Sequence, residues 1–493
     1  MNYIGISSGF HDAGISVVDN FGDILFAGHS ERYSKIKHDK NLSSGLVQDA
    51  LSHVNGDYEL HYYEKPLLKL LRQVRSGEKF SIKNLFDKHL LGSIIHNILE
   101  NKPLITHGHH LSHAAAGFQT SPFTDATVVV VDAIGEFDTI TIWDACYING
   151  KAKYKRIYTK QYPNSVGLFY SAMTHKVGLI PMDEEYILMG MAAYGEPTYL
   201  KEMINEYIAS FKDFEFKQNL HIGTDINFLP DANSMDIASS AQHIVEQFIQ
   251  QIMSKARKLG KSRNLVYAGG VTLNCLANRI LGNYFKNIWI MPNPGDCGSS
   301  LGAAALGYGG KINWQNAFLG HDILGKYPVN RILDVLLTDK IVGVASGRAE
   351  FGPRALGNRS LLADPRGNNI KDKVNEIKRR QKFRPFAPVI LEEYVHSYFD
   401  MPINWHNSRY MQVIGKCRDP KLFPAITHYD GTSRIQTVPK DDSGIRELLE
   451  KWYVLTGCPM LLNTSLNIRG EPMVNDRTDA DRFEYMYGVK VIS

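Results

Sequence analysis

Short apolar runs that end in glycine-rich turns set the pattern of this chain. The runs ATVVVVDAIGE (126–136) and NLVYAGGV (264–271) read as buried strands, and the helical segment TLNCLANRIL (272–281) follows the second. The opening stretch, residues 3–31, alternates apolar runs with Gly and Asp-Asn turns and reads as consecutive strands. Strands that lead through tight turns into helices predict an α/β fold.

Length and composition predict a globular protein of more than one domain. A chain of 493 residues exceeds what one hydrophobic core usually organises, so two or three domains are expected. Its 44% hydrophobic and 22% charged residues are ordinary for a soluble protein. A net charge of +4 permits a polyanionic partner but is too mild to indicate a dedicated nucleic-acid binder.

The N-terminal sequence and the cysteines favour a cytoplasmic protein. The start, MNYIGISSGF, has no basic segment before an apolar core, so no signal peptide is expected. No apolar stretch approaches the roughly 18 residues of a membrane span. The five cysteines are scattered and without CxxC spacing, which favours reduced structural thiols.

The segment 347–388 is rich in Arg, Lys, Gly and Pro and follows the apolar run KIVGVASG. Four of its arginines lie beside or close to a Gly or Pro, namely Arg354, Arg359, Arg366 and Arg384. Their guanidinium groups are therefore expected on turns of defined shape, where they can bind phosphate bidentately. A solvated helix face would mix both charge signs and avoid such turn residues. The segment predicts a site for a nucleotide or a phosphorylated ligand.

Several motifs in this segment and beyond it resemble motifs of the O-carbamoyltransferases related to the nodulation, tobramycin and cephalosporin enzymes. The matching phrases are GPRALGNRS (352–360), ADPR (363–366), FRPFAP (383–388), THYDGTSRIQTV (427–438) and TGCPMLLNTSLNIRGEP (456–472), with more in the N-terminal half. The resemblance implies an enzyme that makes carbamoyl-adenylate from carbamoyl phosphate and ATP, with Mg²⁺, and passes the carbamoyl group to an acceptor hydroxyl.

The resemblance also implies how the domains are organised. Residues 1–330 would form an ATPase-type fold of the actin, Hsp70 and sugar-kinase class (ASKHA), in the branch shared with the tRNA threonylcarbamoyl transferase, and would carry out carbamoyl transfer. Residues 331–493 would form a YrdC-like α/β domain that makes the carbamoyl-adenylate.

Two histidines four residues apart, His109 and His113, lie on one face of an expected helix in HGHHLSHAAAGF. That spacing suits two ligands of one divalent ion. His110 stands where a zinc protease of the HExxH type has its glutamate, so that class of enzyme is excluded. Alone, such a pair is more often structural, with an imidazole bonded to a backbone carbonyl.

The resemblance implies that this pair belongs to a four-ligand site for Fe(II) or a similar divalent ion. The other ligands would be Asp132, at the end of an apolar run, and Asp296, in the turn NPGDCG. Strand ends and Gly-flanked turns are where α/β folds place ligand-binding side chains. The resemblance further implies that His11 is the general base for the acceptor hydroxyl. A structural His11 bonded to Asp12 is an equally supported alternative.

The phrase GGVTLNC predicts a second part of the transfer site. Gly269 and Gly270 follow a strand and precede a helix, where a backbone can approach a nucleotide closely. Two glycines after a strand are a weak signal for a nucleotide site by themselves. The family resemblance strengthens it, because it implies that Asn274 and its neighbours contact the carbamoyl donor. The family usually has Lys where this chain has Ile187; if that lysine helps to bind the acceptor or a phosphate, this chain is expected to take a different acceptor.

For carbamoyl phosphate and ATP, the expected residues are Arg348, Arg354, Lys378, Arg384, His428, Arg434, Asn463, Ser465 and Asn467. The cations would offset the repulsion between two polyanions, and the short polar side chains would hold the ribose and the carbamoyl end. The commoner meaning of LLNTSLN is a capped helix start or an Asn-rich turn. Gln381 stands where many relatives have Glu, with no predicted effect.

Six Lys or Arg residues and one acidic residue lie between Lys65 and Lys83. The surrounding region, about 58–101, has helical spacing, with Leu67, Leu70 and Leu71 on one side and Lys69, Arg72 and Arg75 on the other. A solvated helix face is favoured here over a groove for a polyanion.

Three functions remain open from the residues alone: O-carbamoyl transfer, threonylcarbamoyl transfer to tRNA, and a non-catalytic nucleotide-binding switch. O-carbamoyl transfer is favoured because GPRALGNRS and FRPFAP mark that branch. For the acceptor, the isoelectric point near 8.5 and the basic stretch favour a nucleobase such as 5-hydroxymethylcytosine, in DNA or as a nucleotide. A small-molecule sugar or natural product is the alternative, and the oligomeric state, a homodimer included, is unassigned.

Overall fold

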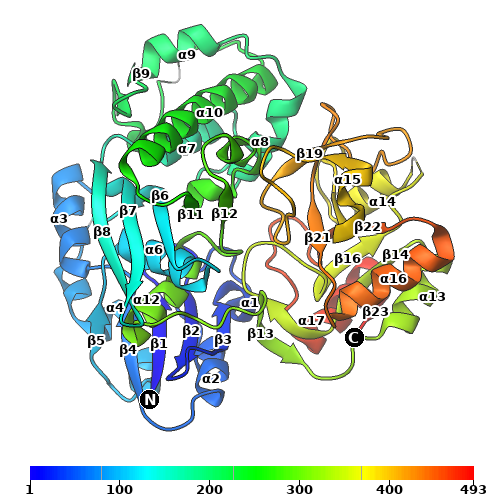
Figure 1. Ribbon diagram of the computed structural model, residues 1–493, viewed down its shortest axis with the longest axis horizontal. Coiled ribbons are helices and arrows are strands. Elements are labelled where there is room, and N and C mark those ends of the chain that lie inside the picture. The colour runs from blue at the N-terminus through cyan, green and yellow to red at the C-terminus, as the bar shows by residue number, and fades with distance from the viewer. Residues whose placement is uncertain (79, 226, 368) are drawn as a thin grey trace.

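The computed structural model describes residues 1–78, 80–225, 227–367 and 369–493 of the chain. Strands and helices alternate through both halves of the molecule, so the predicted α/β class is confirmed (Figure 1). Among the described residues, no helix combines the length and the apolar character that crossing a membrane requires.

The first sheet has the strand order β3-β2-β1-β4-β5. Its strands are β1 (Asn2–Ser7), β2 (Gly14–Asp19), β3 (Ile24–His29), β4 (Tyr58–Tyr62) and β5 (Leu104–Thr106). Strands β1 to β3 are antiparallel neighbours, whereas β4 and β5 run parallel to β1. The apolar runs of the opening stretch therefore form the expected consecutive strands.

The second sheet repeats this plan, with the order β12-β11-β6-β7-β8. Its strands are β6 (Asp125–Gly135), β7 (Asp138–Ile148), β8 (Lys151–Gln161), β11 (Asn264–Ala268) and β12 (Asn287–Trp289). Strands β6 to β8 are antiparallel, and β11 and β12 run parallel to β6. Two sheets of one strand order are the plan of actin-type ATPase folds, so the N-terminal half has the predicted ASKHA architecture.

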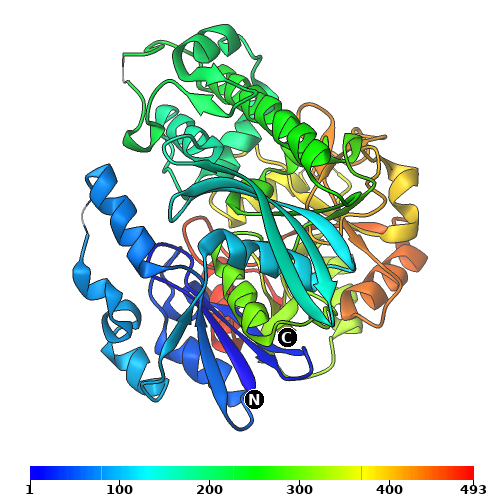
Figure 2. The same ribbon diagram turned by 60° about the vertical axis from the view of Figure 1, so that its left-hand side comes forward.

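Two helices lie between these sheets, α6 (His109–Thr120) on the second sheet and α12 (Ser299–Tyr308) on the first (Figure 2). They approach so closely that a Cβ on Gly302 of α12 would lie 1.8 Å from the carbonyl oxygen of Ser112 on α6. The outer face of the second sheet is covered by a core that includes Phe169 and Phe248. These residues belong to α7 (Val166–Lys176) and α10 (Ser234–Leu259).

The remaining elements of the N-terminal half are short. The helices are α1 (Glu31–Ser34), α2 (Ser44–Ser52), α3 (Pro66–Ser76), α4 (Asp87–Leu91), α5 (Ser93–Ile98), α8 (Glu185–Met191), α9 (Leu200–Tyr207) and α11 (Cys275–Asn278). The 3-10 turns are η1 (Ile82–Leu85), η2 (Ala192–Tyr194), η3 (Leu220–Ile222), η4 (Gly270–Leu273), η5 (Leu281–Asn283) and η6 (Asp296–Gly298), and β9 (Ile208–Ser210) pairs with β10 (Glu215–Phe216).

The C-terminal half is built on a six-stranded sheet of order β21-β17-β22-β16-β14-β23. Its strands are β14 (Ile341–Ala345), β16 (Arg359–Ala363), β17 (Ala387–Leu391), β21 (Gln436–Val438), β22 (Met460–Ser465) and β23 (Val491–Ile492). A small sheet contains β18 (Phe399–Asp400), β19 (Ile414–Cys417) and β20 (Thr432–Arg434). The helices are α13 (Val329–Thr338), α14 (Ile370–Ile377), α15 (Val395–Tyr398), α16 (Gly444–Thr456) and α17 (Arg477–Tyr487), with the turn η7 (Glu392–Tyr394).

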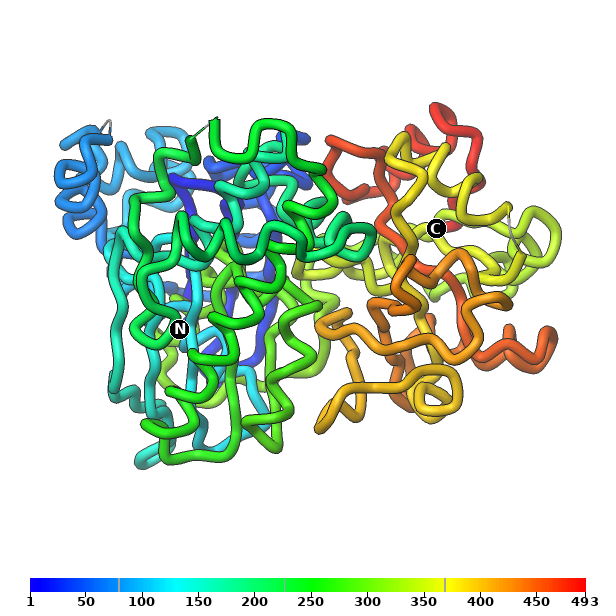
Figure 3. Tube along the Cα trace, turned by 90° about the horizontal axis from the view of Figure 1, so that it is seen from above, coloured from blue at the N-terminus to red at the C-terminus, as the bar shows by residue number. Residues whose placement is uncertain are grey.

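The two halves lie side by side (Figure 3) and share polar contacts. Strand β13 (Phe318–Ile323) pairs with β15 (Gly347–Glu350) across the predicted boundary at 330, which falls at the start of α13 and stays a prediction. Arg469 of the C-terminal half pairs with Glu184 at 2.6 Å. Tyr194 Oη donates to the carbonyl oxygen of Phe383 at 2.6 Å. The loop before α8 and the turn after it therefore hold the halves together.

The region 58–101 differs from its prediction, because it begins with β4 and its helices are short. Helix α3 turns its leucines outward: Leu67 is 55% exposed and Leu71 50%, whereas Arg72 is 5% exposed. The interpretation of this stretch as a solvated basic face is thus wrong at Arg72, which pairs with Glu78. The ion pair of Lys69 with the buried Glu64, at 2.6 Å, connects α3 to the domain.

Replacing Gly302 by Ala tests the close contact between α6 and α12. The new Cβ would meet a backbone oxygen that cannot move without shifting α6, so we expect the free energy of unfolding to fall by at least about 2 kcal/mol. Urea denaturation measures it. The control is Gly190→Ala, a helical position with nothing within 4 Å of the added Cβ, where stability should rise slightly or stay unchanged. Equal stability of both variants would contradict the packing.

Candidate functional site

Two histidines and two aspartates meet where the two sheets of the N-terminal half come together. His109 and His113 lie one turn apart on α6, Asp132 lies in β6 after its buried run, and Asp296 begins η6 ahead of α12. All four are buried, and their ligand atoms lie within 4.8 Å of one another. We call these four residues the histidine–aspartate group.

The spacing within the histidine–aspartate group fits one divalent ion. His109 Nε2 lies 3.1 Å from His113 Nε2 and 3.2 Å from Asp132 Oδ2. Asp296 Oδ1 lies 3.4 Å from His109 Nε2 and 3.3 Å from His113 Nε2. Ligand atoms about 2.1 Å from an ion in a tetrahedral arrangement are about 3.4 Å apart. The structure thus brings the four predicted ligands together, and ion binding by them stays a prediction.

Charge is concentrated in this buried group. Burial lowers the pKa of His109, but Asp296 and Asp132 outweigh that effect and hold the pKa well above its ordinary value. Burial likewise raises the pKa of Asp132, and the hydrogen bond with His109 together with His113 brings it below the usual range. The carboxylates of Asp132 and Asp296 thus favour positive charge at this position, and a divalent ion would supply it.

His11 lies beside this group, in the turn after β1. Its Nδ1 is 2.9 Å from Asp12 Oδ2, and its Nε2 is 3.7 Å from Asp296 Oδ2. Burial lowers the pKa of His11, but the charges of Asp296 and Asp12 outweigh that effect and raise the pKa to about 9. A general base must be neutral, so the predicted role of His11 requires another cation to balance Asp296. The structural contact of His11 with Asp12 is present as well. It is compatible with the role of a general base, because Asp12 contacts Nδ1 and does not contact Nε2.

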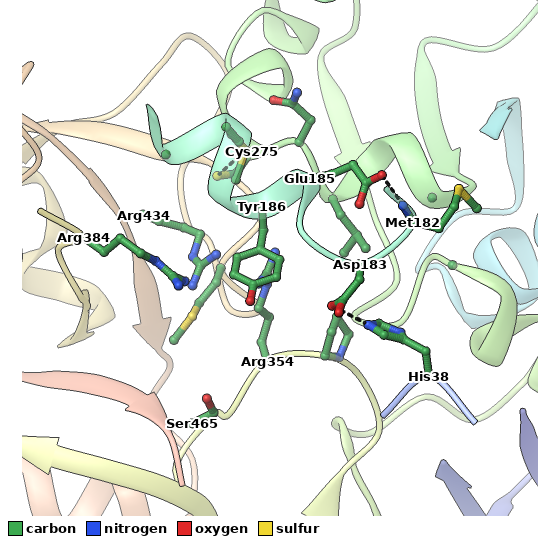
Figure 4. Close-up of a pocket in the computed structure, with 18 of the residues that line it drawn as sticks. His38, Met182, Asp183, Glu185, Tyr186, Cys275, Arg354, Arg384, Arg434 and Ser465 are labelled. Atoms are coloured by element: carbon green, nitrogen blue, oxygen red, sulfur yellow. Dashed lines mark hydrogen bonds and ion pairs between the residues drawn. The ribbon is translucent and has the colours of Figure 1, made fainter. Parts of the chain in front are cut away.

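His11 lines a cavity of about 490 Å³ to which both halves of the chain contribute residues. In Figure 4, Tyr186 stands between His38 and Asp183 on one side and a group of arginines on the other. His38 links two carboxylates, with Nδ1 2.7 Å from Asp12 Oδ1 and Nε2 3.0 Å from Asp183 Oδ1. One end of the cavity therefore carries carboxylates and imidazoles.

The other end carries cations, namely Arg354, Lys378, Arg380, Arg384 and Arg434, which we call the basic end. Within the described part of the chain, none of these five forms an ion pair with Asp or Glu. Burial lowers the pKa of each, and for Arg354 the neighbouring Arg434 adds to this effect. Cations withdrawn from water without a partner are unfavourable, so an anionic ligand would stabilise this end.

Lys378 is the buried member of the basic end. Its ammonium donates to the carbonyl oxygen of Ser465 at 2.5 Å and to Asn467 Oδ1 at 2.9 Å. Ser465 is the last residue of β22, so LLNTSLN is a strand end rather than a capped helix start. The amide nitrogen of Asn463 donates to the carbonyl oxygen of Ala355 at 3.0 Å. Two of the predicted polar residues, Ser465 and Asn467, thus contact the predicted lysine.

The glycine turn lies between the two ends. Gly269 has a φ of +92°, and a Cβ there would lie 2.3 Å from the carbonyl oxygen of Val131, so only glycine fits. The amide of Gly270 donates to Asp132 Oδ1 at 3.0 Å, which ties the turn to the histidine–aspartate group. Asn274 lines the cavity, while its Oδ1 accepts the amide of Ala277 at the start of α11.

Two further predicted contacts have different outcomes. His428 lines the cavity, and burial lowers its pKa to about 4, so it is neutral at pH 7. Arg348 does not line the cavity, because its Nη2 donates to the carbonyl oxygens of Leu25 and Leu319, each at 2.6 Å. We therefore leave Arg348 out of the proposed site.

The two departures from the family pattern lie outside the cavity lining. Ile187 packs in the hydrophobic core, so at this position the chain offers no cation to an acceptor. Gln381 has a buried Oε1 without a hydrogen-bond partner among the described residues.

Sequence reasoning missed several residues of the cavity. Arg380 lies in the phrase KRRQKFR, where its neighbours are equally basic and the sequence does not tell which cations turn inward. His38 and Asp183 are 145 residues apart and meet only through the fold. Tyr186 contacts Arg384, whose guanidinium lies 4.9 Å from the ring centroid. Only the run DEEY, with its three acids before a tyrosine, could have drawn attention to this loop.

Comparison with known sequences places both halves in one family. The family model described as Carbamoyltransferase N-terminus matches residues 53–305, and the one described as Carbamoyltransferase C-terminus matches residues 333–492. The chain belongs to the carbamoyltransferase family. The resemblance recognised from its motifs is thereby confirmed, and the protein is a transferase.

Similar proteins match the carbamoyltransferase over most of its length. An uncharacterized protein of Synechocystis sp. is 31% identical over 97% of this chain and 93% of its own. The nodulation protein NolNO of Sinorhizobium fredii is 29% identical over 97% of this chain and 77% of its own. The nodulation protein NolO of Bradyrhizobium diazoefficiens is 31% identical over 76% of this chain and 75% of its own.

Solved structures resemble the carbamoyltransferase only distantly. Component A of the (R)-2-hydroxyglutaryl-CoA dehydratase of Acidaminococcus fermentans covers 62% of this chain with 98% of its own, at 13% identity and a TM-score of 0.35. HypF of T. kodakarensis covers 62% with 47% of its own, at 13% identity and a TM-score of 0.33. The fold assignment therefore stands on the repeated strand order.

One divalent ion per chain is expected at the histidine–aspartate group. Elemental analysis after dialysis against Fe(II), Co(II) or Zn(II) measures it. His113→Ala removes one ligand and should lower the affinity at least about 100-fold. The matched control is His110→Gln, because His110 is buried on the same helix but bonds Thr141 Oγ1 at 2.9 Å instead. Unchanged binding by the His113 variant would exclude this site.

Proposed function

We propose that this carbamoyltransferase makes carbamoyl-adenylate from ATP and carbamoyl phosphate and then transfers the carbamoyl group to an acceptor hydroxyl. The observation that carries this proposal is one cavity lined at one end by five cations without an acidic partner among the described residues, and at the other by His11 and the two aspartates of the histidine–aspartate group. The cations suit two phosphate-bearing substrates, and His11 suits a second reaction that needs a base.

In the first reaction, water releases phosphate from carbamoyl phosphate and leaves carbamate. A carbamate oxygen then attacks the α-phosphorus of ATP, and pyrophosphate leaves. Both substrates are polyanions that repel each other, so the reaction needs fixed positive charge around the reacting phosphate. Arg354 and Arg384 can bind phosphate oxygens bidentately, and Lys378 holds the strand end at Ser465 that would face the carbamoyl group.

In the second reaction, the acceptor oxygen attacks the carbamoyl carbon and AMP leaves. His11 would take the hydroxyl proton on Nε2 while Asp12 holds the other ring nitrogen. The histidine–aspartate group would hold Fe(II) or a similar ion, which when bound supplies positive charge that stabilises the developing oxyanion. That charge would also balance Asp296, which otherwise keeps His11 protonated.

The shared cavity supports direct passage of the adenylate from one reaction to the other. Carbamoyl-adenylate is hydrolysed readily, so an enclosed path protects it. Residues 331–493 would serve as the YrdC-like adenylate-forming domain and residues 1–330 as the transfer domain. Tyr186 lies between the two ends and contacts Arg384 of the basic end, a position that suits a residue along this path.

For the acceptor, we propose the hydroxymethyl group of a pyrimidine, such as 5-hydroxymethylcytosine. Helix α3 supports it, because Lys69 lies 5.6 Å from the ring centroid of Phe10, which lines the cavity. Lys65, Arg75 and Lys83, along the same segment, are exposed and can meet phosphates. The alternative acceptor is a small-molecule sugar or natural product, and a transfer assay with both kinds of acceptor distinguishes the two.

Arg354→Met should abolish the first reaction, lowering pyrophosphate release from ATP and carbamoyl phosphate by at least about 100-fold, because bidentate charge on a phosphate is lost. A coupled pyrophosphate assay measures it. Arg366→Met is the matched control, since Arg366 pairs with Asp364 in the same segment and does not line the cavity. Equal losses in both variants would indicate unfolding rather than a substrate contact.

The acceptor is identified by mass spectrometry after incubation with ATP, carbamoyl phosphate and Fe(II). DNA with 5-hydroxymethylcytosine, the free nucleotide and an aminoglycoside are offered in parallel, and the product gains one carbamoyl group. His11→Ala should lower transfer by about 100-fold or more while pyrophosphate release continues. Transfer to DNA should also fall steeply as salt rises, as phosphate contacts require. Transfer to the aminoglycoside alone would overturn the proposed acceptor, and unchanged transfer by His11→Ala would overturn the base.

A further inference from the structure

His109 presents one ring nitrogen to the histidine–aspartate group and buries the other. Its Nε2 is the atom near Asp132 and Asp296, whereas its Nδ1 has no hydrogen-bond partner among the described residues. An imidazole that binds an ion through Nε2 carries its proton on Nδ1. A buried N–H group without an acceptor is unfavourable, so a hydrogen-bond acceptor for Nδ1 would stabilise this arrangement.

The side chain that faces this nitrogen is Glu64, in the turn after β4. Its Oε2 lies 3.9 Å from His109 Nδ1, and Glu64 is 3% exposed. The other oxygen, Oε1, accepts a hydrogen bond from Lys69 Nζ at 2.6 Å. One carboxylate oxygen is therefore fixed by Lys69, and the second is free to accept the proton of His109. A shift of less than about 1 Å would bring it to hydrogen-bond distance.

The placement of Lys69 accounts for the unusual orientation of α3. This helix exposes Leu67 and Leu71 and turns Lys69 and Arg72 toward the domain. Apolar packing alone would produce the opposite orientation. The ammonium of Lys69 also lies 5.6 Å from the ring centroid of Phe10, the neighbour of His11. The pair of Glu64 and Lys69 thus connects α3 with the proposed metal ligand and with the turn that carries the proposed base.

We infer that Glu64 is a positioning residue for His109: it accepts the Nδ1 proton and so presents Nε2 to the divalent ion, and Lys69 fixes its carboxylate. The inference rests on the metal site of the proposed function and is independent of the acceptor and of adenylate formation. Carboxylates that hold a ligand histidine in this way fix the tautomer and the ring orientation and raise the basicity of the ligand nitrogen.

A purely structural ion pair that anchors α3 is the competing explanation, and the chain offers a matched control for it. Glu78 pairs with Arg72 of the same helix, has its Oε1 3.6 Å from His221 Nδ1, and forms no ion pair with His109. Glu64→Gln and Glu78→Gln therefore both remove an ion-pair partner of α3, but only Glu64→Gln removes the carboxylate beside a proposed metal ligand.

The experiment measures Co(II) affinity by competition with a chelator, together with the visible absorption spectrum of bound Co(II). Glu64→Gln should weaken Co(II) binding by about 10-fold or more and change the spectrum, because the ligand histidine loses its charged acceptor. Glu78→Gln should bind Co(II) with the parent affinity and spectrum. Parent-like affinity and spectrum in Glu64→Gln would overturn the inference.

A crystal structure of the Co(II)-loaded parent gives a second measurement that needs no variant to fold. It should show Glu64 Oε2 within about 3.2 Å of His109 Nδ1, and a carboxylate turned away would overturn the inference. A parent that binds Co(II) tightly but transfers no carbamoyl group would refute the proposed function and leave the role of Glu64 standing. A parent that binds no Co(II) would overturn the metal site and the inference together.

Discussion

The close approach of α6 to α12 is the contact on which the N-terminal half depends. Each helix covers one of the two sheets, so the distance between the helix axes sets the distance between the sheets. Gly302 permits backbone-to-backbone contact at Ser112, one residue before His113. Because Asp296 begins the turn that leads into α12, the same contact brings Asp296 to the histidines of α6. A packing constraint thus determines the geometry of a charged site.

Charges of opposite sign are kept apart within one cavity. Near His11, Asp12 and Asp183 already have an imidazole partner in His38. The basic end has no such compensation, so its cations gain most from a ligand that brings negative charge. This asymmetry suits the proposed reactions, in which the enzyme binds two polyanionic substrates and then a neutral hydroxyl. The cavity therefore matches the order of the two proposed reactions along its length.

Sequence predicted the elements well where the pattern was local. The buried run before Asp132, the helix that carries His109 and His113, and the meeting of these residues with Asp296 all follow from strands, turns and a family resemblance. Periodicity shows which residues share a face of a helix but not which of them are buried, so the burial of Arg72 and the exposure of Leu67 and Leu71 on α3 were not predicted.

Other parts of the site depend on contacts between distant segments, which one sequence does not reveal. Arg348 lies in the same basic segment as Arg354, yet its strand pairs with β13 and turns the guanidinium toward backbone carbonyls. His38, which follows α1, contacts Asp183 in the loop before α8, 145 residues later. In both cases tertiary packing, rather than local propensity, decides what a charged side chain contacts.

The loop before α8 has a consequence for how this family can diversify. Three of the four residues from 183 to 186 serve different parts of the molecule: Asp183 contacts His38, Glu184 pairs with Arg469 of the other half, and Tyr186, in the first turn of α8, contacts Arg384. A substitution that adapts this loop to a new acceptor would also disturb the joint between the halves and the basic end. Evolution of acceptor choice should therefore proceed through positions with fewer contacts, such as Leu67 and Leu71 of α3, which are exposed and can change without cost to the core.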